Sequence, residues 1–269
     1  MAKKILSYLC IYIILTADVI AQNITFNENF NNTLTLNIGV NDFHIKDERI
    51  SPLIFRGILF SSYASYKYRD NKFTHDVETF ISLGKIFSTF NQNLVEQFAG
   101  CISYSLLHQI YNVDYANSNI NLNLGAGIKS FVSYENTLDP NYFILSGEDS
   151  WYWSHSLNLI FSGVYNIVNK HSINFQLSSP FIRTVSRPDF SQNQLYYEVE
   201  SNHLKAAKYG DIEFLWNDFV IFSNLSYVYN LSKHIGLNIS YNFYYASTHK
   251  TQFMGLYSNN FLLGGGWQF

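Results

Sequence analysis

The chain has 269 residues, of which 14% are charged and 18% aromatic, and its formal net charge is −3. Nucleic-acid binding relies on concentrated positive charge, so this balance excludes nucleic acid as an expected partner. Soluble domains usually carry about 25% charged residues, so the composition favours a chain whose surface partly faces lipid.

The first residues have the pattern of a secretory signal peptide. Two lysines precede an apolar stretch over residues 5–16, and Val19 and Ala21 provide small side chains at a signal-peptidase site. The stretch is shorter than the roughly 20 apolar residues of a membrane-spanning helix. We expect residues 1–21 to be removed, which leaves residues 22–269 as an exported domain; an uncleaved anchor is the alternative.

One cysteine, Cys101, is left after that cleavage, because Cys10 lies in the signal stretch. An exported domain with a single thiol has no internal disulfide. Its stability must have another source, and a closed hydrogen-bonded sheet in lipid is one.

Alternation of apolar and polar residues is the main structural signal. It is clearest over residues 236–245, where Leu237 and Ile239 point to one side of a strand and Asn238 and Ser240 to the other. The same pattern predicts about ten strands, near residues 33–43, 53–68, 73–86, 94–110, 119–134, 151–168, 171–183, 212–231, 234–248 and 257–269. Each strand would have one apolar and one polar face, as in a membrane barrel.

The connections between these strands alternate in length. Short ones lie at residues 69–72, 169–170 and 232–233, and long ones at residues 135–150 and 184–211. Bacterial barrels have short periplasmic turns and longer extracellular loops, so both termini are expected in the periplasm. Two connections fit less well, because residues 112–118 are long for a turn and residues 88–93 are short for an outer loop.

The predicted fold is all-β: a single antiparallel transmembrane β-barrel of about ten strands, with eight or twelve as alternatives. Aromatic residues gather near predicted strand ends, at Trp151, Trp153, Tyr227, Tyr229 and Trp267. Such rings favour the headgroup level of a bilayer. A soluble exported β-sandwich or lipocalin-like barrel, in which the aromatics would fill a core, is the alternative.

The last nine residues, Phe-Leu-Leu-Gly-Gly-Gly-Trp-Gln-Phe, resemble the final strand of Gram-negative outer-membrane β-barrel proteins. In that class a terminal aromatic residue, with apolar residues at alternate positions before it, is recognised by the insertion machinery. The matching positions are Phe261, Leu263, Trp267 and Phe269, and Gly265 departs from the pattern. The resemblance implies a place in the cell outer membrane, with its lipid, its lipopolysaccharide and the barrel-insertion machinery as partners. The composition is also similar to that of Bacteroidetes outer-membrane proteins.

A hydrolytic site of the kind found in membrane barrels would require a histidine close to a serine. The outer-membrane phospholipase A and the lipid A deacylases carry a His-x-Ser pair on one strand, where both side chains share a face. Here His155-Ser156 and His171-Ser172 are adjacent and point to opposite faces. His155 is expected on the lipid side, and a His–Ser pair assembled from different strands stays open.

Protease and metal patterns are equally weak. Outer-membrane proteases use Asp and His near the outer rim, and the acids and histidines at plausible heights or in loops are His75, Asp76, His203, Asp211, Glu213 and Asp218. No spacing ties them together, and solvated loop charges are the alternative. No two histidines are spaced i, i+2 and Cys101 has no sulfur partner, so no metal site, cofactor or catalytic residue is predicted.

The predicted inward face carries four candidate charges, Lys67, Asp76, Glu78 and Lys129. They could line an ion path, or Lys67 could pair with Asp76 or Glu78. The interior of a ten-stranded barrel is only slightly wider than one that side chains can fill. A hydrogen-bonded plug of side chains and water is therefore expected, with a narrow small-solute pore as the alternative.

The long connection over residues 184–211 contains Arg187, Tyr196 and Tyr197, which suit a ligand or a surface partner. A solvated loop over the barrel mouth is the alternative. The predicted function is accordingly a non-enzymatic outer-membrane barrel, structural or binding, with porin-like passage of small solutes as a variant. The alternative from another class is a lipid- or peptide-hydrolysing barrel enzyme.

Overall fold

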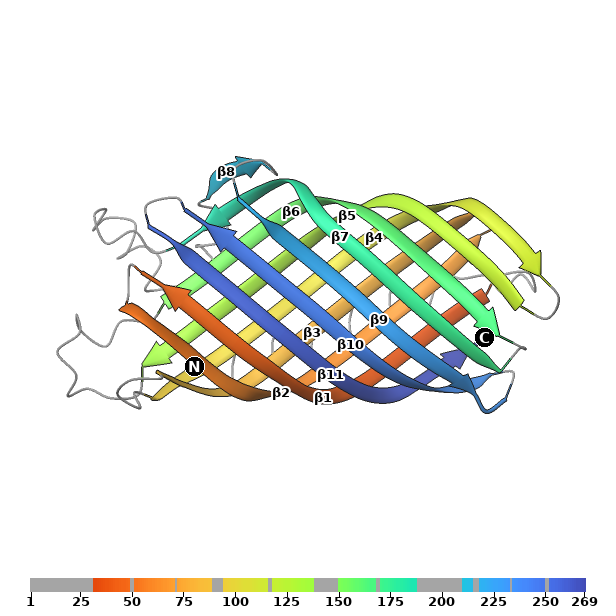
Figure 1. Ribbon diagram of the computed structural model, residues 1–269, viewed down its shortest axis with the longest axis horizontal. Helices are drawn as coiled ribbons and strands as arrows, with labels where there is room; N and C mark the ends of the chain where they lie inside the picture. Colours follow the sequence, from red (N-terminus) through yellow and green to blue (C-terminus); the bar gives the residue numbers. More distant parts are fainter. Residues whose placement is uncertain are drawn as a thin grey trace, which may run out of the picture. The chain divides into compact units, whose positions relative to one another are not determined.

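The computed structural model in Figure 1 describes residues 31–48, 51–70, 72–88, 94–115, 118–137, 150–167, 170–187, 210–214, 218–232, 234–249 and 252–269. Its strands are β1 (Asn31–Asp47), β2 (Ser51–Asp70), β3 (Phe73–Ser88), β4 (Leu94–Tyr115), β5 (Ser118–Thr137), β6 (Ser150–Ile167), β7 (His171–Ser186), β8 (Asp211–Phe214), β9 (Val220–Asn230), β10 (Ile235–Thr248) and β11 (Met254–Gln268). The expected signal peptide, residues 1–21, lies outside the described residues.

The strands form one antiparallel sheet that closes on itself. Strands β1 to β6 pair in chain order, β1 also pairs with β11, and β6 pairs with β7. Ten strands make the closed wall, and β8 extends the line of β9 along β7. Closure gives each of the ten wall strands a partner on both edges, which lipid demands because it cannot hydrogen-bond a free edge. The prediction of one antiparallel barrel of about ten strands is confirmed.

The two ends of the barrel differ in the connections that they carry. At the short-turn end, on the right of Figure 1, the joins β2–β3, β4–β5, β6–β7 and β9–β10 each span two to four residues between strand ends. At the opposite long-loop end, residues 138–149 and 188–209 connect strands and lie outside the described residues. Both β1 and β11 meet at the short-turn end, where Asn32 N donates to Phe269 O at 3.0 Å.

One turn is much shorter than the sequence indicated. Residues 112–118 were expected to form a long turn, but β4 and β5 run on until residues 116–117 alone separate them. The polar residues there pair across the hairpin: Asn119 Nδ2 donates to Asn112 Oδ1 at 2.7 Å. A bulge between Gln109 and Tyr111 absorbs the extra residue.

Side chains alternate between an apolar outer face and the lumen. Ile38, Ile128 and Leu263 point outward and are each 61% exposed, whereas Asn238 and Ser240 point inward and are 6% and 4% exposed. The predicted alternation is therefore present, and so much outward apolar surface is expected of a barrel in lipid. Over the described residues, no helix has the length and apolar character to cross a membrane.

The wall is broken where one long strand was expected over residues 212–231. From Ser178 to Ile182, β7 advances four residues (182 − 178), but the facing chain from Phe214 to Phe222 has eight (222 − 214). The surplus residues cannot stay in the ladder, so the strand divides into β8 and β9. Over the described residues β8 pairs with β7 alone.

Buried side chains bridge this break between β8 and β10. Arg183 Nε donates to Glu213 Oε2 at 2.8 Å, and Arg183 Nη2 donates to Ser247 O at 2.7 Å. Thr248 Oγ1 donates to the other Glu213 oxygen at 2.6 Å. Both charged side chains are only 3% exposed, so the cost of burying their charges is offset only while these partners are all present.

Replacing Arg183 alone should therefore destabilise the barrel strongly. Arg183→Met leaves Glu213 buried without its cation, and we expect a loss of about 3–5 kcal/mol in urea unfolding of the refolded protein. The double variant Arg183→Met/Glu213→Met should recover most of that loss, since no lone charge is left inside. Equal losses in the single and double variants would contradict this account.

The close approach of β1 and β11 depends on Gly264, because a side chain at this position would collide with β1. A Cβ on Gly264 would lie 1.9 Å from Leu36 O and 2.6 Å from Asn37 Cα. At Gly266 a Cβ would meet nothing closer than Thr35 Oγ1 at 3.6 Å. The first position therefore admits no side chain unless the closing strand moves.

Gly264→Ala should weaken barrel closure by about 1–3 kcal/mol, because overpacking forces the backbone apart. The matched control Gly266→Ala should be close to wild type. Heat-dependent migration on gels, followed against temperature, reports the loss of the closed form. A Gly264→Ala barrel as heat-resistant as Gly266→Ala would refute the argument.

Candidate functional site: the lumen

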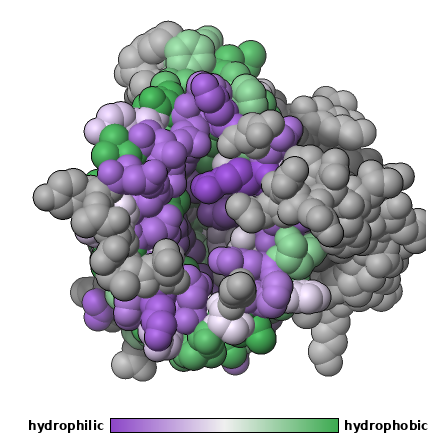
Figure 2. All heavy atoms as spheres, turned by 90° about the vertical axis from the view of Figure 1, so that its right-hand side faces the viewer, coloured by the Kyte–Doolittle hydropathy of each residue, from purple (hydrophilic) through white to green (hydrophobic). Residues whose placement is uncertain are grey.

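The short-turn half of the lumen is lined by amide and hydroxyl groups that bond to one another. Asn37 Nδ2 donates to Ser240 Oγ at 3.2 Å, and Asn123 Nδ2 donates to Ser162 Oγ at 3.3 Å. Figure 2 looks at this end and shows hydrophilic side chains around its hollow, with hydrophobic ones toward the edge. The Lys67 side chain points inward yet is 41% exposed, so water enters this half of the lumen.

The four charges predicted for the lumen lie together but do not form one cluster of ion pairs. Lys67 Nζ lies 3.2 Å from Asp76 Oδ2, and Asp76 is fully buried. Glu78 instead accepts from Tyr63 Oη at 3.0 Å and from Ser103 Oγ at 3.4 Å. The ammonium of Lys129 lies 3.4 Å from the centre of the Phe222 ring. Thus one of the proposed pairings forms; Glu78 lies within electrostatic range of both members of that pair, and Lys129 has an aromatic partner.

An apolar layer crosses the lumen above these charges, and we call it the apolar seal. Phe131 of β5 lies 4.6 Å, centre to centre, from Tyr244 of β10. Since β10 is four strands around the wall from β5, this contact crosses the lumen. Tyr244 stacks on Phe222 at 4.2 Å, and Phe131 reaches Tyr152 at 6.0 Å. The seal also includes Phe43, Ile45, Leu59, Ile86, Val95, Ala99, Val185, Val220, Ala246, Met254 and Leu256, all at most 6% exposed.

The seal coincides with an inversion of the alternation along the strands. On β1, Ile38 and Val40 are apolar and point outward, but further on Phe43 points inward while Asp42 and His44 point outward. The same inversion places Arg56, Lys85 and Glu96 outside and Leu59, Ile86, Val95 and Leu256 inside. The outer face of the long-loop half thus gains charged side chains, among apolar ones such as Ile58 and Phe219, while its interior is mainly apolar around the buried pair of Arg183 and Glu213. The predicted alternation did not include this inversion, although the sequence Asn-Asp-Phe-His-Ile-Lys-Asp at residues 41–47 shows it.

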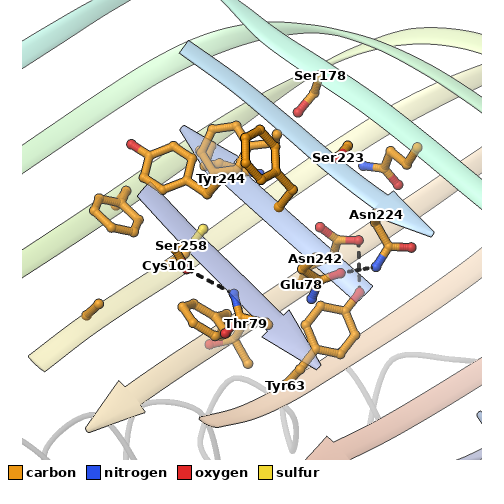
Figure 3. Close-up of a pocket in the computed structure, with 18 of the residues that line it drawn as sticks. Tyr63, Glu78, Thr79, Cys101, Ser178, Ser223, Asn224, Asn242, Tyr244 and Ser258 are labelled. Carbon is orange, nitrogen blue, oxygen red and sulfur yellow. Dashed lines mark hydrogen bonds between the residues drawn. The ribbon is translucent and has the colours of Figure 1, made fainter. Parts of the chain in front are cut away.

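Between the seal and the charged layer lies a cavity of about 80 Å³. Figure 3 shows Tyr63 and Glu78 on one side, Tyr244 on another, and the hydrogen-bonded pair Asn224 and Asn242 in the wall. Cys101 also lines it as a free thiol. This is the place in the lumen where aromatic, amide and charged groups converge.

The mouth at the long-loop end is bridged by an ion pair. Arg187 Nη2 lies 2.6 Å from Asp47 Oδ1, joining the ends of β7 and β1, and Arg187 Nη1 donates to Gln252 O at 3.1 Å. The Arg187 side chain is only 5% exposed. Its expected role in ligand binding stays a prediction, and the companion residues Tyr196 and Tyr197 lie outside the described residues.

Histidine and serine do meet, on the outer face of the wall. His155 Nδ1 lies 2.9 Å from Ser130 Oγ of the neighbouring strand, and the ring stacks on Trp153. His155 was expected on this face, but its partner could not be seen without the register of β5 against β6. Over the described residues the imidazole has no further hydrogen bond.

The other candidate acids and histidines are scattered. His75 lies near the short-turn end, where its Nδ1 lies 2.8 Å from Tyr104 Oη, whereas His249 and Asp218 pair at 2.9 Å at the long-loop end. His203 lies outside the described residues. Within the described ranges, no group of three or more His, Cys, Asp or Glu side chains could hold a metal ion.

The C-terminal aromatic residues lie on the outer face at the short-turn end. Trp267 and Phe269 are 55% and 39% exposed, and their ring centres are 5.0 Å apart. This position leaves both rings accessible from outside the barrel. Their role as an insertion signal stays a prediction.

No family model and no curated protein sequence matches this chain. Among solved structures, the outer membrane protease OmpT from Escherichia coli aligns over 92% of this chain and 99% of its own, at 8% identity and a TM-score of 0.50. Neisserial surface protein A aligns over 88% and 97%, at 12% identity and a TM-score of 0.38. The attachment invasion locus protein Ail of Yersinia pestis aligns over 88% and 99%, at 8% identity and a TM-score of 0.34.

Identity this low shows the fold alone, and says nothing of protease activity. What the chain shares with OmpT is its fold, that of an outer-membrane β-barrel, which in this chain is closed and antiparallel with ten strands in the wall.

Proposed function

We propose that the protein is a non-enzymatic barrel of the bacterial outer membrane that is closed to passage and acts as a structural or binding protein. The observation that carries this proposal is the apolar seal. Its aromatic rings meet across the lumen, and a constriction lined mainly by apolar side chains, with the Tyr152 and Tyr244 hydroxyls as its polar atoms, opposes the passage of water and ions. A barrel closed in this way can bind molecules on its surface or in its lumen, but it does not let solutes pass through.

The placement in the membrane follows from the outer face. The bilayer surrounds the short-turn part, where outward side chains are apolar and where Tyr66, Tyr68 and Trp267 supply interfacial rings. The strands have up to 22 residues, more than the 9–11 or so that a bilayer requires. The long-loop half therefore stands outside the bilayer, on the cell surface, with the short turns in the periplasm.

The seal gives a direct test in planar bilayers. The refolded wild-type protein should show no channel events, whereas Phe131→Ala/Tyr244→Ala should conduct, because removing both rings leaves a gap in the contact across the lumen. Phe261→Ala is the matched control: it removes a ring that is 57% exposed on the outer face and should stay silent. Channel events in the wild type would refute the proposal.

One observation favours a second candidate, a lipid-ester hydrolase. The Ser130 hydroxyl lies within hydrogen-bond reach of the His155 imidazole on a face turned to lipid, the first requirement of a serine nucleophile. Within the described residues, this pair lacks the other components of a serine hydrolase site. No carboxylate or amide orients the imidazole, and the strand amides around it belong to the ladder, so no oxyanion site is formed.

A fluorophosphonate probe separates the two candidates. We expect no labelling of the refolded wild type above that of Ser130→Ala, because the serine is not activated. Labelling that disappears in both Ser130→Ala and His155→Phe would establish the hydrolase and overturn the non-enzymatic proposal. Cleavage of phospholipid in the same micelles, followed by fatty-acid release, is the confirming measurement.

A further inference from the structure

Two opposite charges face the cavity in the lumen without pairing to each other. Glu78, Ser103 and Lys129 are consecutive cross-strand neighbours on β3, β4 and β5, so only the small serine stands between the two charged residues. Glu78 (Figure 3) and Lys129 both line the cavity beneath the seal. Within the described residues, neither of them belongs to an ion pair, although Lys67 and Asp76 beside them do.

Two hydroxyl groups orient the carboxylate of Glu78, which also lies within electrostatic range of Lys67 and Asp76. Tyr63 Oη and Ser103 Oγ donate to its two oxygens from opposite sides. Hydroxyl donors fix a carboxylate's orientation, but they leave its charge in place. A carboxylate has about four lone-pair sites, so this one keeps capacity for a further donor.

The ammonium of Lys129 is also only partly satisfied. It rests on the face of Phe222, and Phe222 stacks on Tyr244 of the seal. A ring face attracts a cation but accepts no ordinary hydrogen bond, so the ammonium keeps donors for an anion. The same cavity thus contains a carboxylate that can bind a cation and an ammonium that can bind an anion, beside the aromatic rings of Phe222 and Tyr244.

We propose that this chamber binds a small zwitterion, an α-amino acid or a similar molecule that carries an ammonium and a carboxylate. Its ammonium would meet Glu78, its carboxylate would meet Lys129, and its carbon atoms would lie against the aromatic rings. The cavity of about 80 Å³ holds two or three waters at roughly 30 Å³ each, so the ligand is of the size of glycine or alanine. Charge complementarity on both ends excludes simple anions and simple cations as equal partners.

The ligand would enter from the short-turn end. The exposure of Lys67 shows that water enters the lumen from that side, and the seal closes the other. The chamber is therefore blind-ended. Only this single entrance rests on the proposed function, because an open pore would add a second entrance but leave the chemistry of the site unchanged.

Equilibrium dialysis with radiolabelled glycine tests the proposal on the refolded protein. We expect saturable binding to the wild type. Glu78→Gln and Lys129→Met should each weaken it by about ten-fold or more, since each removes one charge-assisted contact. Lys85→Met and Glu96→Gln change the same residue types on the outer face and should bind as the wild type does. Heat-dependent gel migration confirms that each variant is folded.

Competition in the wild type keeps the test independent of the variants. Acetate and methylammonium each carry one of the two charges, so each should displace glycine about ten-fold less well than unlabelled glycine. If acetate competes equally and Glu78→Gln still binds, the chamber is an anion site and the inference is wrong. If glycine does not bind a folded barrel that is silent in planar bilayers, the zwitterion site falls while the closed barrel stands.

Discussion

In the proposed placement, each long strand of this barrel passes through two solvents, lipid and water, and that constraint accounts for much of the rest of the structure. In lipid the outer face must be apolar and the polar groups must turn inward; in water the reverse is stable. The strands satisfy both by inverting their alternation part-way along, as β1 does between Val40 and Phe43. The backbone ladder is unchanged across the inversion, so closure is continuous while the interior changes from polar to apolar.

The apolar seal follows from this inversion. Where charged residues enter the outer face, apolar residues of ten strands point into the same lumen and pack as a core. Below it, the polar residues that lipid excludes face one another and water. The boundary between the two layers leaves a chamber in which Glu78 and Lys129 meet aromatic rings. A chamber closed on one side suits binding better than transport.

Much of the fold could be predicted from the sequence, because period-2 alternation and turn lengths report strands directly. The inward positions of Lys67 and Asp76 could be read in the same way. Features that depend on strand register or on neighbours far along the chain could not be predicted. They are the contact of Ser130 with His155, the ion pair of Arg183 with Glu213, and the division into β8 and β9. The inversion is present in the sequence, but it is hard to recognise there because aromatic residues suit both a lipid-facing surface and a buried core.

The claim that the inversion marks the edge of the bilayer can be measured directly with spin labels. Cysteines at positions 38 and 44, in a Cys101→Ser background, place labels on the outer face of β1 on either side of the inversion. In reconstituted bilayers, position 38 should be accessible to oxygen and shielded from a water-soluble nickel complex, and position 44 should show the opposite. Equal lipid exposure at both positions would contradict the account.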